Sequence, residues 1–78
     1  MNVPAFLEKL TAAYPDHHLA PSLILSYVKD KGYYASIHTF PNGMQSRTII
    51  AKASNASYEG VLEDIATIWL TMQEMSKI

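Results

Sequence analysis

The sequence predicts an α+β fold in the order α-β-β-β-α, a three-stranded antiparallel sheet with two helices packed on one face. Two turn signals, Lys-Asp-Lys-Gly at residues 29–32 and Pro-Asn-Gly at residues 41–43, divide residues 22–53 into three segments of strand length. Apolar residues recur at helical spacing on either side of these segments. A length of 78 residues suits one domain, so we expect residues 1–78 to form a single domain.

The first helix is predicted to run from Val3 to Tyr14. Asn2 suits the N-cap position, Pro4 suits the first turn, and Pro15 disfavours helical geometry at the residue before it. The residues that would face the sheet recur three or four positions apart: Val3, Phe6, Leu7, Leu10 and Tyr14. A loop is predicted to follow before the first strand.

Residues 22–28 fit either a helix or a strand, because their apolar positions suit both periods. We favour a strand, because residues 30–32 suit a three-residue hairpin loop that ends in Gly32. Such a loop would pair Tyr27 with Ala35 and so set the register of the first two strands. The predicted inner face, which both helices would cover, holds Leu23, Leu25, Tyr27, Ala35, Ile37 and Ile50.

The second hairpin is predicted to close through a two-residue type I′ turn of Asn-Gly at residues 42–43. This turn would place Ile37 opposite Thr48 on the inner face and His38 opposite Arg47 on the outer face. The second of these pairs could bind an anion. We favour the interpretation that His38 and Arg47 are simply polar residues on a partly covered face.

The second helix is predicted to run from an N-cap at Asn55 to about Ser76. Its apolar stripe contains Tyr58, Val61, Leu62, Ile65, Ile68, Trp69, Met72 and Met75. Three acidic residues, Glu59, Glu63 and Asp64, lie off this stripe near the start of the helix. They suit the helix dipole there, and they are also candidates for contact with a basic partner.

The predicted outer face is more apolar than a solvated sheet face usually is. Large apolar side chains from all three strands would lie on it, beside two polar residues of the second hairpin. Together they form the candidate interface: Ile24, Val28, Tyr34, His38, Phe40, Arg47 and Ile49. Because a small domain covers only one sheet face with its own helices, this second apolar face predicts contact with another protein chain.

The α-β-β-β-α order resembles the topology of the double-stranded-RNA-binding domain over most of the chain. The resemblance implies that a basic cluster at the N-terminus of the second helix would bind the phosphates of duplex RNA. Residues 54–65 contain no lysine or arginine and three acidic residues instead. The resemblance therefore extends to the fold and not to RNA binding.

Composition and motif spacing argue against several other functions. The formal net charge of −1 is no electrostatic footprint for nucleic acid, and no apolar run is long enough to span a membrane. Cysteine is absent, and His17 and His18 have no further ligands at metal-site spacing. The serines form no nucleophile motif and the glycines no phosphate loop. We therefore expect no metal, no cofactor and no catalytic residue.

These observations predict a small non-enzymatic interaction or regulatory protein that forms a homodimer through its outer sheet face. One alternative is a nucleic-acid-associated regulator that binds as a dimer, supported only by Lys29, Lys31, Arg47 and Lys52. Another is a module that binds a small anion or ligand around His38. The N-terminus has no signal-peptide pattern, so a cytoplasmic location is expected. Compact, cysteine-free chains of this size are often encoded by phages and mobile elements, and by analogy we expect such an origin.

Overall fold

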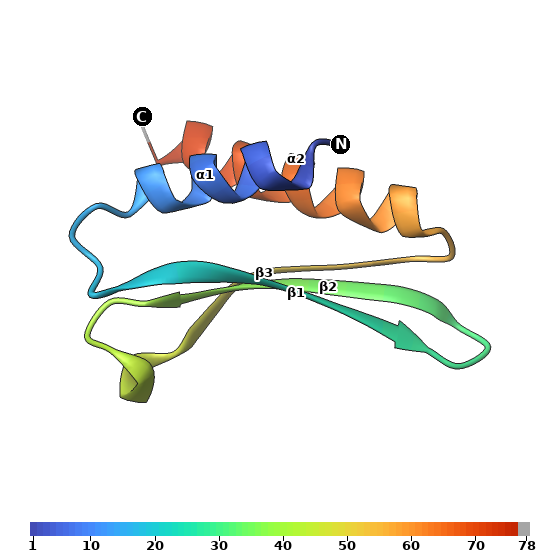
Figure 1. Cartoon of the computed structure of the whole chain (residues 1–78). Helices are drawn as coiled ribbons and strands as arrows, with labels where there is room; N and C mark the ends of the chain where they lie inside the picture. The colour runs from blue at the N-terminus through green and yellow to red at the C-terminus, as the bar shows by residue number, and fades with distance from the viewer. Residues whose placement is uncertain (77–78) are drawn as a thin grey trace.

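The computed structural model describes residues 1–76 and confirms the predicted order of a helix, three antiparallel strands and a second helix (Figure 1). The elements are α1 (Val3–Ala13), β1 (Leu19–Val28), β2 (Gly32–Phe40), the short 3-10 helix η1 (Met44–Ser46), β3 (Thr48–Asn55) and α2 (Tyr58–Met75). The strands lie in the order β1-β2-β3, so β2 is central and β1 and β3 form the two edges. Both helices cover one face of the sheet, and η1 lies on the other side (Figure 1).

Helix α1 begins as the sequence predicts. The Asn2 side chain accepts a hydrogen bond from the Ala5 backbone N–H at 3.0 Å, and Pro4 occupies the first turn. The helix ends at Ala13, with Tyr14 as its C-cap. Phe6 and Leu10 are the buried residues of its stripe.

The first hairpin confirms that residues 22–28 form a strand, but its register differs from the prediction. Tyr27 pairs with Tyr33, and Leu25 pairs with Ala35. The loop is one position earlier than predicted, because Asp30 takes a positive φ of 64° and Gly32, at φ 107°, already belongs to β2. The resulting shift of two residues keeps every β1 side chain on its predicted face, since strand side chains alternate with a period of two.

The predicted register of the second hairpin is wrong. No two-residue turn forms at residues 42–43, since residues 41–47 make a longer connection that contains η1. Ser46 organises it: its hydroxyl accepts a hydrogen bond from the Asn42 backbone N–H at 2.7 Å and donates one to the Gly43 carbonyl at 2.8 Å. Ile37 consequently pairs with Ala51.

A β-bulge then changes the face that parts of β3 present. Ser36 pairs with Lys52 and His38 pairs with Ile49, so one extra β3 residue is accommodated between these pairs. Ala51 therefore lies opposite Ile37 on the inner face, where the predicted register would have placed it on the outer face, and Lys52 lies opposite Ser36 on the outer face. Ile50 is partly buried against the core.

The core lies between the inner face of the sheet and the two helices. Its buried side chains come from α1, the two strands β2 and β3, and α2: Phe6, Leu10, Ala35, Ile37, Ala51, Val61, Ile65 and Trp69. Helix α2 is capped by Ser57, whose hydroxyl accepts a hydrogen bond from the Gly60 N–H at 2.9 Å. The predicted cap, Asn55, instead accepts one from the Ser57 N–H and donates one to the Asp64 carboxylate.

Candidate protein-interaction surface

Edge strand β1 exposes apolar side chains on both faces of the sheet. Ile24 and Val28, on the outer face, are 40% and 43% exposed, and Leu25 and Tyr27, on the inner face, are 37% and 63% exposed. The exposure of the inner-face pair follows from element lengths. The 11 residues of α1 span about 16 Å, whereas the ten residues of β1 span about 33 Å, so the helix covers only part of the strand.

The outer face is less exposed at the end of β2 than the sequence predicts. Ile49 is 50% exposed and Tyr34 is half-buried, but His38 and Phe40 are only 5% and 6% exposed. The segment that contains η1 lies against this end of β2 (Figure 1), which explains the burial. Arg47 is exposed and precedes β3, so it does not form the predicted cross-strand pair with His38.

A serine-histidine pair that sequence spacing did not single out lies in the covered region. The Ser36 Oγ and the His38 Nε2 are 2.9 Å apart, within the reach of a nucleophile and a general base. Ser36 is only 3% exposed, however, and the His38 Nδ1 has no hydrogen-bond partner among residues 1–76 to orient the ring. The Ser36 hydroxyl is thus enclosed within the sheet, whereas a nucleophile must be accessible to its substrate.

The surroundings of His38 shift the pKa of its imidazole. Burial, and then the positive charge of Arg47, lower the pKa of the imidazole below its usual value of 6.5. Only Arg47 therefore carries a positive charge near neutral pH, which weakens the case for an anion site at these two residues.

We expect this shift to make stability depend on pH. As pH falls below about 6.5, the unfolded chain takes up a proton that folded His38 resists, so stability is full above that pH and declines toward the folded pKa. Urea unfolding at pH 7.5 and 5.5 measures the decline, and His38→Gln should reduce it. His18→Gln, at an exposed loop position, is the control. An unchanged pH dependence in His38→Gln would contradict this explanation.

The acidic candidates Glu59, Glu63 and Asp64 all lie exposed on α2. Glu59 is in the first turn, where a negative charge favours the helix dipole. The Asp64 carboxylate accepts a hydrogen bond from the Asn55 side chain at 3.0 Å, which ties the end of β3 to α2. Local stabilisation thus accounts for two of the three acids.

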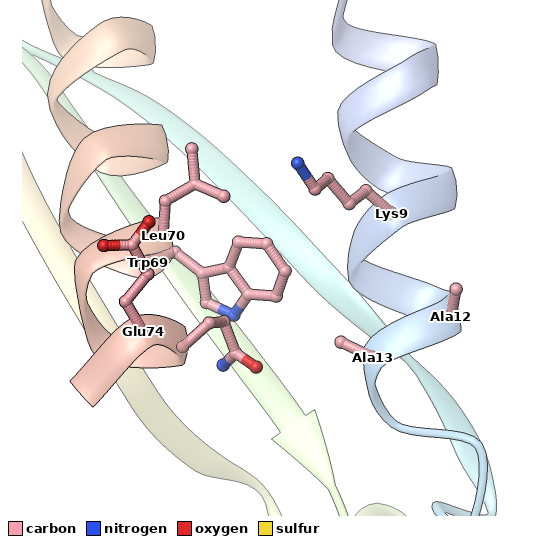
Figure 2. Close-up of a pocket in the computed structure, with 7 residues that line it drawn as sticks. Lys9, Ala12, Ala13, Trp69, Leu70 and Glu74 are labelled. Carbon is pink, nitrogen blue, oxygen red and sulfur yellow. The ribbon is translucent and has the colours of Figure 1, made fainter. Parts of the chain in front are cut away.

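A groove separates the two helices on the covered side of the sheet. Its cavity volume is about 460 Å³, and its lining includes Ala12 and Ala13 of α1 and Trp69 and Leu70 of α2. The Ala13 methyl points toward Trp69 across it (Figure 2). The two alanines are too short to fill the space between the helices. Lys9 and Glu74 also line the groove, and the Trp69 N–H is already donated to the Tyr14 hydroxyl at 3.0 Å. The groove thus combines apolar side chains with one charged side chain of each sign.

Across the described residues, neither clusters of metal-ligating side chains nor long apolar helices point to another kind of site. Across residues 1–76, no three His, Asp or Glu side chains come close enough together to hold a metal ion. Neither helix in this range is both long and apolar enough to cross a membrane. Comparisons with protein-family models, curated proteins and solved structures find no match for the chain.

Proposed function

We propose that this chain is a small non-enzymatic interaction protein that binds another protein chain along the β1 side of its sheet. The observation that carries the proposal is the exposure of four large apolar side chains on this one edge strand. We call this set, Ile24, Leu25, Tyr27 and Val28, the β1 surface. A long apolar edge strand that is left uncovered is a template for pairing with another strand.

The character of the two sheet edges supports the choice of β1 over β3. Strand β1 contains no charged residue, and its own irregularity, with Pro21, is confined to residues 19–22 at its start, whereas β3 contains Lys52 and a bulge at residues 49–51. Charges and bulges are the features that keep edge strands from pairing with other chains. Helix α2 also packs on β3.

Site-specific photo-crosslinking tests the proposal. Benzoylphenylalanine in place of Tyr27 should crosslink to a protein, either in purified solution or in an extract of the native host. The same group in place of Met75, which is 67% exposed against 63% for Tyr27, is the matched control and should crosslink far less. Equal yields at the two positions, or no crosslink at Tyr27, would refute the proposal.

Nucleic-acid binding is the competing function, and we expect it to be absent. The acidic residues at the start of α2 would repel a phosphate backbone where the resembling family carries basic residues. Fluorescence anisotropy with labelled duplex RNA at physiological salt should therefore show no binding at micromolar protein. A submicromolar complex whose affinity falls steeply with salt would support the competing function.

A further inference from the structure

We propose that the partner on the β1 surface is a second copy of this chain, whose β1 pairs antiparallel with the first to make one six-stranded sheet. This inference rests on the proposed function and adds the identity and the geometry of the partner. Identical strands that pair antiparallel are related by a two-fold axis, which is the symmetry of most homodimers. The pairing would satisfy the backbone groups that the β1 edge leaves without a strand partner in the described residues.

The sequence of β1 is compatible with itself in this arrangement. Its regular part, Ser22–Val28, pairs with β2 without interruption and contains only apolar and hydroxyl side chains. A two-fold axis at Leu25, the middle residue, brings all seven positions of this segment into the new ladder. Leu23 then lies opposite Tyr27 of the second copy on the inner face, and no like charges meet.

The charges at the two ends of β1 are complementary. The turn at one end consists of Lys29, Asp30 and Lys31, two positive charges and one negative, and Asp16 lies in the loop before the other end. Antiparallel pairing brings the basic turn of one copy to the end that carries Asp16 in the other. Opposite charges at the ends therefore favour the antiparallel register over a parallel one.

The inner-face contact would also cover the exposed end of an aromatic row. The Tyr27 and Tyr33 rings lie 5.2 Å apart edge to face, and Tyr33 and Tyr58 continue the row at 5.7 Å. Tyr27 is the exposed end of this row at the β1 edge. Contact with Leu23 of the second copy would cover its free side, as cross-strand aromatic pairs do within a sheet.

A charge-reversal experiment tests whether the two-fold axis of the dimer lies at Leu25. Sedimentation velocity of the wild-type chain at tens of micromolar should give a species of about twice 8.7 kDa. Leu25→Lys and Leu25→Glu, each alone, should weaken the dimer at least about 100-fold, because like charges then meet directly across the axis. An equimolar mixture of these two variants should restore the dimer. Ile49→Lys, at an exposed position on the opposite edge strand β3, is the matched control and should remain dimeric.

Disulfide trapping gives an independent measurement of the register. Because the chain has no cysteine, Leu25→Cys introduces a single thiol, which should form a disulfide between copies under mild oxidation. Ser54→Cys, at an exposed position on the opposite edge strand, should not. Circular dichroism of each variant confirms that it is folded.

The outcomes separate this inference from the proposed function. A wild-type monomer at these concentrations, or a dimer lost in Ile49→Lys and kept in Leu25→Lys, overturns the β1 pairing. If Tyr27 crosslinks to a different protein while the chain stays monomeric, the proposed function stands and the self-pairing fails. If Tyr27 crosslinks to nothing, both fail.

Discussion

Replacement of Trp69 by alanine is expected to lower the free energy of unfolding by about 3–5 kcal/mol. Trp69 is only 2% exposed, and its ring meets that of Phe6 edge to face at 5.7 Å. Its indole N–H donates to the Tyr14 hydroxyl, which also accepts a hydrogen bond from Gln73. Trp69 thus connects α2 to the N-terminal half of α1 through Phe6 and to the C-cap of α1 through Tyr14, and its removal would loosen the two helices together.

Urea unfolding followed by far-ultraviolet circular dichroism measures this loss. Small domains have about 5–15 kcal/mol of stability in total, so the variant should be partly or fully unfolded in mild denaturant. Trp69→Phe keeps an aromatic ring and loses the N–H donor, so it should cost less, about 1–3 kcal/mol. Met75→Ala, at an exposed position of the same helix, should change stability by less than about 0.5 kcal/mol. A small loss in Trp69→Ala would mean that α1 and α2 are held by other contacts.

The helices and the order of the strands could be predicted because burial imposes a period on the sequence. Phe6 and Leu10 in α1, and Val61, Ile65 and Trp69 in α2, are all buried as their spacing predicts. The choice of a strand for residues 22–28 was also correct. This choice depended on the position of Gly32. Both the predicted and the observed pairing of the first two strands need a glycine with positive φ beside the turn.

The second hairpin could not be predicted from local turn preferences. Asn-Gly at residues 42–43 suits a type I′ turn, but hydrogen bonds from Ser46 stabilise a longer loop. The register of the expected turn also placed Ile50 opposite Ala35 on the inner face, whereas the structure places Ala51 and Ala53 opposite the inner residues of β2. Small side chains suit these positions because α2 packs directly on β3, a tertiary contact that no local pattern contains.

The candidate surface was predicted in part for the same reasons. Alternation along β1 placed Ile24 and Val28 correctly on the outer face, since a two-residue shift does not alter the face. The burial of His38 and Phe40 depends on the path of residues 41–47, which the sequence does not define. The exposure of Tyr27 depends on how far α1 reaches along the sheet, which periodicity does not define either.

Replacement of Gly32 by alanine is the second change that should strongly destabilise the fold. Gly32 has a φ of 107°, which side-chain-bearing residues rarely adopt. A Cβ there would lie 2.7 Å from the Asn55 carbonyl oxygen and 2.8 Å from the Ala56 Cα. Both neighbours are backbone atoms and cannot rotate away, so the start of β2 and the end of β3 would have to separate.

We expect Gly32→Ala to cost about 3–5 kcal/mol, the sum of backbone strain and the steric overlap. Gly43→Ala is the matched control: Gly43 also has a positive φ, 95°, but no atom lies within 4 Å of its added Cβ. That variant should lose only the strain, about 1–3 kcal/mol. The difference between the two, measured by urea unfolding, isolates the contact between Gly32 and residues 55–56. Equal losses would show that β2 and β3 can part at this end without cost, and that the turn conformation alone requires glycine.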